Sequence, residues 1–118
     1  MIFVVDSDQN AYRSLAKLVE AEGFAITAYS SGEDFFSSAN PDTDDIVVLD
    51  LETVDLSGVE LKEFIHRRHI ASRTIITSTG GYPEAPKLAK QLGAIGYFSK
   101  PVDGLALMDL IRFVLCDD

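Results

Sequence analysis

The sequence is short of cysteine, of cations and of long apolar runs, and each shortage excludes a class of protein. Among its 118 residues there is a single cysteine, Cys116, so no disulfide can form within the chain. No stretch is long and apolar enough to span a bilayer, and Met1 leads straight into a strand-like run without the basic flank of a signal peptide. We therefore expect a cytoplasmic protein with no membrane contact.

Positive charge is scarce: 10 Lys and Arg stand against 19 Asp and Glu, which gives a formal net charge of −9. Nucleic-acid phosphates require clustered cations, so we expect no direct nucleic-acid binding by this chain. We also find no internal repeat, low-complexity segment or linker. This length and composition predict one globular domain over residues 1–118.

Short apolar segments alternate with amphipathic segments along the chain. Runs rich in β-branched or aromatic residues predict strands at 2–5, 24–29, 46–49, 74–77 and 95–98. Helical spacing of apolar residues predicts helices at 9–22, 32–38, 58–69, 86–92 and 103–115. Repeated strand–helix units give an α/β fold, a doubly wound (βα)5 flavodoxin-like three-layer sandwich with a parallel sheet of order 2-1-3-4-5.

Two local signals refine the helices. Ser57 and Glu60 have the spacing of a capping box and predict a helix start. Pro83 and Pro86 fall where the fourth helix should begin, and proline is tolerated only in a first turn. We therefore expect a short fourth helix with a loose lead-in across residues 80–81.

Polar residues close four of the predicted strands. Asp6 follows the first strand, Asp50 the third, Ser78 the fourth, and Lys100 comes just after the fifth. Ligands of doubly wound sheets bind at the carboxyl ends of the strands, near the switch between strands 1 and 3. Two carboxylates this close favour a hard divalent cation such as Mg²⁺. A carboxylate nucleophile, a cation and a lysine suit phosphoryl transfer.

The segment Asp6-Ser7-Asp8 also has the D-x-D pattern of haloacid-dehalogenase-type phosphatases. In those enzymes the two acids are the nucleophile and its acid/base partner. Their pattern requires Thr or Val after the second acid, whereas Gln9 follows here, and a late acidic pair for which only Asp103 is available. The phosphatase interpretation is therefore disfavoured.

Five pieces of sequence support another interpretation: VVDSD, VVLDL followed by DLSGVEL, TS after the fourth strand, GAIGYF, and KP. With these pieces in this order, the chain resembles the receiver domains of two-component response regulators, the CheY-like superfamily, over nearly its whole length. The 28 positions from Asp50 to Ser78 (78 − 50) and the 50 from Asp50 to Lys100 (100 − 50) fit that family.

The resemblance implies a role for the acids. Asp50 matches the phosphoacceptor, Asp6 the first member of an acidic pair that holds Mg²⁺ or Mn²⁺, and the backbone carbonyl of Glu52 the third protein ligand. The second member of the pair is normally an acid, and here it is Ser7, with Asp8 one residue further on. Either could be an additional ligand. Loss of a ligand charge predicts weak cation binding.

The resemblance also implies roles beyond the cation. Lys100 matches the lysine that pairs with phosphoryl oxygens, and Pro101 matches a proline usually preceded by a cis bond. Ser78 and Tyr97 match the two switch residues, while Thr79 lies where a small residue controls access.

Two further departures lie in the segment after Asp50. The Glu52 side chain places an acid beside the site, where it would either supply charge to the cation or repel a phosphoryl group. Thr53 and Val54 replace a common Met-Pro pair, and we expect this to loosen the loop.

The implied function is a signalling switch. A histidine kinase or a phosphotransfer protein would donate to Asp50, and the surface of the fourth helix, fifth strand and fifth helix would respond. The domain would catalyse only its own phosphorylation and dephosphorylation, so it is no turnover enzyme. A homodimer and a fused or separate DNA-binding effector domain are compatible with the resemblance.

Ser7 supports an alternative function: a degenerate, unphosphorylated receiver that acts as a protein-interaction module.

Overall fold

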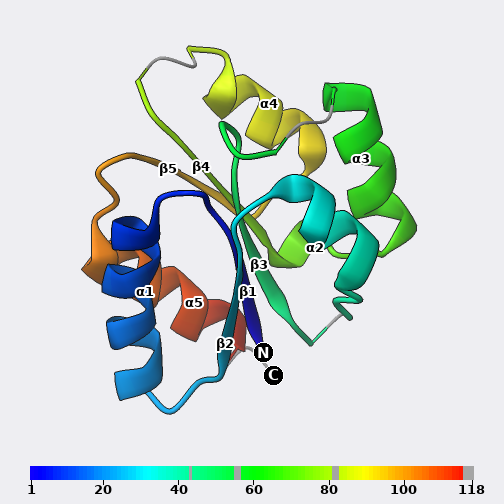
Figure 1. The fold of residues 1–118 in the computed structure, drawn as a ribbon. Coiled ribbons are helices and arrows are strands. Elements are labelled where there is room, and N and C mark those ends of the chain that lie inside the picture. The colour runs from blue at the N-terminus through cyan, green and yellow to red at the C-terminus, as the bar shows by residue number, and fades with distance from the viewer. Residues whose placement is uncertain (43, 55–56, 81–82, 116–118) are drawn as a thin grey trace.

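The structure is a computed structural model that describes residues 1–42, 44–54, 57–80 and 83–115. Strands and helices alternate in the order β1 (Ile2–Val5), α1 (Gln9–Ala21), β2 (Ile26–Tyr29), α2 (Gly32–Ser38), β3 (Ile46–Asp50), α3 (Gly58–Arg67), β4 (Thr74–Ser78), α4 (Ala85–Leu92), β5 (Gly96–Ser99) and α5 (Gly104–Leu115), with a 3-10 turn at Ala71–Arg73. The strands form one parallel sheet of order β2-β1-β3-β4-β5 (Figure 1). The predicted fold class and strand order are confirmed.

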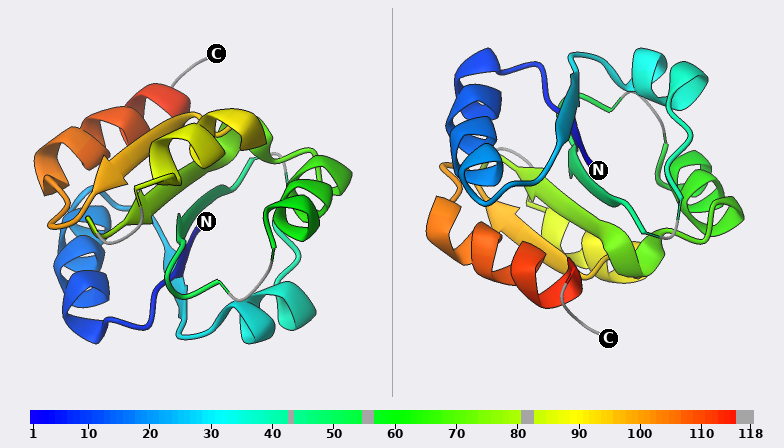
Figure 2. Two further views of the ribbon diagram at one scale, coloured as in Figure 1. Left: turned by 90° about the horizontal axis from the view of Figure 1, so that it is seen from above. Right: turned by 90° about the horizontal axis from the view of Figure 1, so that it is seen from below.

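Helices cover both faces of this sheet. Helices α1 and α5 lie on one face and α2, α3 and α4 on the other, which is clear from above and below in Figure 2. Because successive side chains of a strand point to opposite faces, Ile2 and Val4 of β1 pack with α1 and α5, whereas Val5 packs on the other side. This double burial explains the consecutive apolar residues of the central strands.

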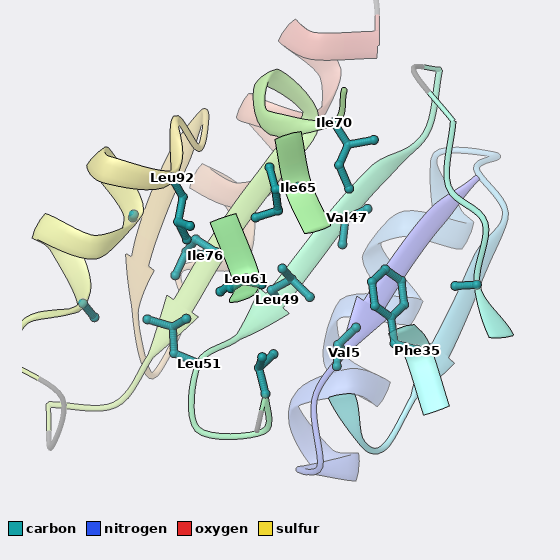
Figure 3. Packing of buried hydrophobic residues seen from close by; sticks show 14 residues of the cluster. Val5, Phe35, Val47, Leu49, Leu51, Leu61, Ile65, Ile70, Ile76 and Leu92 are labelled. Atoms are coloured by element: carbon teal, nitrogen blue, oxygen red, sulfur yellow. The ribbon is translucent and has the colours of Figure 1, made fainter. Parts of the chain in front are cut away.

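The larger of the two cores lies under α2, α3 and α4 (Figure 3). Phe35 of α2 and Leu61 and Ile65 of α3 are at most 1% exposed and pack with Val5 and Leu49 of the sheet. Burial of each such side chain contributes about 1.5–3 kcal/mol to folding. This core fixes β1 and β3, the two strands that carry the acids.

Two elements, β2 and α3, are two residues shorter than predicted, and in each case a helix ends in a local cap. The Phe24 amide donates to the Val19 carbonyl beyond Gly23, whose φ is 86°, so β2 begins at Ile26 instead of residue 24. Helix α3 ends at Arg67 instead of residue 69. His69 takes a φ of 56°, and the Ile70 amide reaches back to the Ile65 carbonyl.

The other helix signals are confirmed where the structure describes them. Ser57 and Glu60 form the predicted capping box at the start of α3. Helix α4 has Pro86 in its first turn, as expected. The predictions on Gly81 and Cys116 fall outside the described residues. None of the helices in the described ranges has the length and apolar character that a bilayer crossing requires.

Candidate functional site

The strand register brings four of the predicted residues to one edge of the sheet. Val5 lies opposite Leu49, so Asp6 and Asp50 leave neighbouring strands side by side. Asp50 in turn lies opposite Thr77, just before Ser78. The Lys100 amide donates to the Ser78 carbonyl at 2.8 Å, which places this lysine at the same edge.

Lys100 joins the two carboxylates. Its Nζ lies 2.8 Å from Asp6 Oδ2 and 3.4 Å from Asp50 Oδ1. Burial disfavours the ammonium, but the hydrogen bond to Asp6 and the charge of Asp50 outweigh it, and the pKa of Lys100 is raised above its ordinary value. The lysine is therefore a fixed cation between two acids. The bond between Lys100 and Pro101 is cis, as expected.

The two oxygens of Asp50 have different surroundings. Oδ2 accepts a hydrogen bond from the Thr53 hydroxyl at 2.7 Å. Oδ1 is buried and has no hydrogen-bond partner within the part of the chain that the structure describes, although Lys100 is near. Asp50 as a whole is only 3% exposed. A buried carboxylate oxygen without a donor is costly unless a cation or a reacting group uses it.

Thr53 connects Asp50 to Ser7. The Ser7 amide donates to Thr53 Oγ1 at 3.0 Å, and the two hydroxyl oxygens lie 3.2 Å apart. The amides of Thr53 and Val54 both donate to the Asp50 carbonyl, and Val54 is only 9% exposed. Thr53 therefore ties the start of this loop to Asp50 and Ser7, and the expected loosening relative to a Met-Pro pair stays a prediction. Residues 55–56 lie outside the described part of the chain.

Asp8 has a structural contact that the sequence analysis missed. Its Oδ1 accepts from the amides of Asn10 and Ala11, so Asp8 is the N-cap of α1. An acid directly before the predicted helix at 9–22 was the signal for this cap. The Asp8 amide donates to Asp6 Oδ1 at 2.9 Å, which orients the first acid.

The predicted switch residues contact each other. The hydroxyls of Ser78 and Tyr97 lie 2.7 Å apart, and either could be the donor. Ser78 is fully buried, and the half-buried Tyr97 ring packs against the core under α2, α3 and α4. This contact links the end of β4, at the edge of the site, to β5.

The Glu52 side chain spans two loops. Its Oε1 accepts from the Thr79 amide at 2.7 Å, so the segment after β3 is tied to the segment after β4. Neither of the two roles expected for this carboxylate included such a contact. Both residues are exposed and border the site that Asp50 occupies.

The donor set fits a weakly held divalent cation. Asp6 and Asp50 provide two carboxylates at the same edge of the sheet, both next to Lys100. The described residues contain no group of three or more Asp, Glu, His or Cys side chains that could hold a metal. Two carboxylates with backbone and water oxygens suit Mg²⁺, which keeps several waters.

A cavity of about 570 Å³ opens beside the site. Asp6 and Lys100 lie at its polar side, and Leu15, Leu18 and Leu107 of α1 and α5 form apolar wall. It lies on the α1/α5 side of the sheet, so Asp6 faces this cavity whereas Asp50 faces the loop that carries Thr53.

Comparison with known proteins agrees with this geometry. Residues 2–112 match the family described as response regulator receiver domain. The transcriptional regulatory protein FixJ of Azorhizobium caulinodans is 32% identical over 113 residues, which are 94% of this chain and 53% of that protein. Nodulation protein W of Bradyrhizobium diazoefficiens is 31% identical, over 94% of this chain and 49% of its own.

A solved structure shows the same fold. The crystal structure of full-length FixJ from B. japonicum superimposes with a TM-score of 0.82 at 24% identity, covering 98% of this chain and 57% of that one. The chain thus spans about half the length of the relatives it matches.

Proposed function

The chain belongs to the family of response regulator receiver domains, and on that premise we propose that Asp50 accepts a phosphoryl group from the phosphohistidine of a histidine kinase or a phosphotransfer protein. The observation that carries this proposal is the buried Asp50 Oδ1, 3.4 Å from Lys100 and without a hydrogen bond among the described residues. Receivers are not an enzyme family, and the domain would catalyse only its own phosphorylation and dephosphorylation.

The proposed reaction is an in-line displacement. An Asp50 oxygen would form a bond to phosphorus while the bond from phosphorus to the histidine nitrogen breaks and its electrons stay on nitrogen. Lys100 would pair with the charge that spreads over the phosphoryl oxygens. Because such reactions depend on positioning and on neutralisation of oxygen charge, a fixed cation beside the nucleophile is what they require.

Members of this family generally bind Mg²⁺, and the residues that would hold it here are Asp6, Asp50 and the backbone carbonyl of Glu52. When bound, the cation supplies positive charge next to the phosphoryl oxygens. Ser7 provides a neutral hydroxyl where a third charge would help, so we expect the affinity for Mg²⁺ or Mn²⁺ to be low. Asp8 keeps its helix cap and would not be needed.

We further propose that Ser78 and Tyr97 transmit the change. A phosphoryl oxygen would compete for the Ser78 hydroxyl, which now pairs with Tyr97 at 2.7 Å. Release of Tyr97 would alter the surface formed by α4, β5 and α5. A change in that surface is how a local chemical event would reach a partner.

The output of the whole protein is a proposal from its relatives. One relative is named a transcriptional regulatory protein, and this chain covers 53% of it. We propose that the receiver controls transcription through a fused or separate DNA-binding effector, in the cytoplasm. A homodimer through α4 or α5 stays a prediction.

The test is the intact mass of the protein after incubation with acetyl phosphate and Mg²⁺, beside samples with EDTA and with Asp50→Asn. We expect the native chain to gain one phosphoryl group, and both controls to gain none. A folded native chain that gains none from acetyl phosphate or from kinase phosphohistidine would contradict the proposal.

One observation favours a second candidate function, that of an unphosphorylated protein-interaction module. Ser7 carries no charge, and one oxygen of Asp8 is already used in the cap of α1, so the cation site lacks the usual second acid at position 7. In that case the surface of α4, β5 and α5 would bind its partner equally well with Asp50→Asn, which a pull-down with the native chain and this variant would show.

A further inference from the structure

Thr53 contacts both Asp50 and Ser7. Its amide donates to the Asp50 carbonyl at 3.0 Å, which fixes it in the turn after β3. Its hydroxyl lies 2.7 Å from Asp50 Oδ2 and receives the Ser7 amide at 3.0 Å. None of these contacts belongs to the roles assigned so far.

Counting protons gives the direction of each contact. A hydroxyl has one proton to donate and two lone pairs that accept. The proton of Thr53 goes to Asp50 Oδ2, since a carboxylate is the stronger acceptor and the distance is short. The Ser7 amide then takes one lone pair, and the Ser7 hydroxyl can donate to the other across 3.2 Å. The Thr53 hydroxyl is thus fully used, and its orientation is fixed.

This arrangement distinguishes the two oxygens of Asp50. The hydrogen bond from Thr53 occupies Oδ2 and stops the Asp50 carboxylate from rotating about its terminal torsion. Oδ1 is left toward Lys100 at 3.4 Å, buried and without a donor among the described residues. An oxygen that gives no lone pair to a hydrogen bond is the better nucleophile. The β-branched side chain of Thr53 is itself stiff, so the orientation costs little entropy at the moment of reaction.

We propose that Thr53 is a positioning residue that holds Oδ2 of Asp50 and presents Oδ1 as the attacking oxygen. This inference rests on the proposed phosphorylation of Asp50. In the step it serves, an Oδ1 lone pair forms the bond to phosphorus while the bond from phosphorus to the donor's leaving atom breaks. The leaving group keeps those electrons. Thr53 forms no bond to phosphorus and moves no proton.

Ser7 has a part in this arrangement as well. Its backbone amide and its hydroxyl both contact the hydroxyl of Thr53. These contacts orient the Thr53 hydroxyl toward Asp50. A serine at position 7 therefore replaces a charged cation ligand by a hydroxyl that lies 3.2 Å from the hydroxyl of Thr53. Thr53 and Ser7 together hold the nucleophile by hydrogen bonds, without a further negative charge next to it.

The experiment compares initial rates of Asp50 labelling, by intact mass, at saturating Mg²⁺ and over a range of acetyl phosphate concentrations. Thr53→Val keeps the shape of the side chain and removes the hydroxyl, whereas Thr53→Ser keeps the hydroxyl. Thr27→Val is a matched control on β2, where the hydroxyl contacts only the Met1 sulfur among the contacts described. Melting followed by circular dichroism shows whether each variant folds, and calorimetry measures its Mg²⁺ affinity.

We expect Thr53→Val to lower the maximal rate by about tenfold or more, because the attacking oxygen is no longer held in place. The acetyl phosphate concentration at half-maximal rate should stay within about twofold, since Thr53 does not touch the donor. Thr53→Ser should recover most of the rate, and Thr27→Val should match the native chain. Thr53→Val should bind Mg²⁺ at least as tightly as the native chain, because a competing donor to Oδ2 is gone.

Other results overturn the inference in distinguishable ways. If the native chain is labelled and folded Thr53→Val is labelled as fast or faster, Thr53 does not position the nucleophile, and the proposed function stands. If Thr53→Val loses Mg²⁺ affinity in proportion to its rate, Thr53 acts on the cation and the inference is wrong. If Thr53→Val does not fold, the rate of Thr53→Ser decides: a rate far below that of the native chain contradicts the inference. If the native chain is never labelled, both proposals fail together.

Discussion

Position 7 sets how much negative charge surrounds the cation site. Replacing Ser7 by Asp adds a carboxylate on the loop that already carries Asp6, and divalent affinity rises with ligand charge. We expect Ser7→Asp to lower the Mg²⁺ dissociation constant by about tenfold, equivalent to about 1.4 kcal/mol. Calorimetric titration measures it. Ser38→Asp, which adds the same charge at the exposed end of α2, is the control and should leave the affinity unchanged.

An unchanged affinity in Ser7→Asp would mean that this side chain does not face the cation. The same variant also separates the two candidate functions. Labelling that appears only when the acid is restored would locate the native defect in the cation site.

Lys100 determines how stability depends on alkaline pH. Its pKa is raised above 10.5 in the folded protein, so its contribution is complete below that value and is lost as the pH rises through the folded pKa. Lys100→Met leaves two buried carboxylates without their cation and should cost about 2 kcal/mol of unfolding free energy near pH 8.

Urea unfolding at a series of pH values from 8 upward checks the sign of this pH dependence. The difference between the native chain and Lys100→Met should be flat at first and shrink at the highest pH. Lys87→Met, at an exposed position of α4, should show no such difference. A difference that grows with pH would contradict the assignment.

The sequence was sufficient to place four site residues and insufficient to predict the loop contacts around them. Asp6, Asp50, Ser78 and Lys100 were predictable because each closes an apolar strand of one parallel sheet, so topology alone brings them to one edge. The hydrogen bond of Thr53 to Asp50 depends instead on how a short loop turns back on β3. No periodicity encodes that turn, so this hydrogen bond could not be predicted from the sequence.

At the scale of secondary-structure elements, the termini of strands and helices were the uncertain part. Strand β3 includes Asp50 and β4 includes Ser78, so both residues belong to the sheet and do not begin the loops. Helix α3 ends through a left-handed His69, where a glycine would be the usual signal. A cap made by an unfavoured residue type cannot be predicted from composition.

The loops after β3 and β4 are joined by the contact of Glu52 with the Thr79 amide. Glu52→Ala removes a charge-assisted hydrogen bond, and we expect exchange of the Thr79 amide proton to become about tenfold faster. Amide hydrogen exchange followed by nuclear magnetic resonance measures it. Glu63→Ala, which removes an exposed acid of α3, is the control.

The same variant decides between the two roles expected for the Glu52 charge. If this carboxylate serves the Thr79 amide, Glu52→Ala keeps its Mg²⁺ affinity and is labelled faster by anionic donors, because one repelling charge is gone. Weaker Mg²⁺ binding would instead show that Glu52 supplies charge to the cation. Unchanged exchange at Thr79 would mean that the contact is not formed in solution.

At the scale of the whole molecule, the net charge of −9 makes general screening a rival explanation for any stabilisation by salt. A cation bound by Asp6 and Asp50 must stabilise the folded state beyond screening, because it binds the folded chain alone. For a dissociation constant on the order of 1 mM, about 10 mM free Mg²⁺ adds about 1.4 kcal/mol of stability. In a domain of this size that raises the melting temperature by about 4–7 °C.

Melting followed by circular dichroism distinguishes the two effects when MgCl₂ is compared with NaCl at equal ionic strength. NaCl screens the nine excess charges but has no particular affinity for the two acids, so its shift gives the contribution of screening. Asp50→Asn keeps the shape of the side chain and removes one ligand charge, so in this variant Mg²⁺ should do no more than NaCl. Equal shifts from both salts in the native chain would mean that the acids at the sheet edge hold no cation. In that event Lys100 alone would have to neutralise an incoming phosphoryl group.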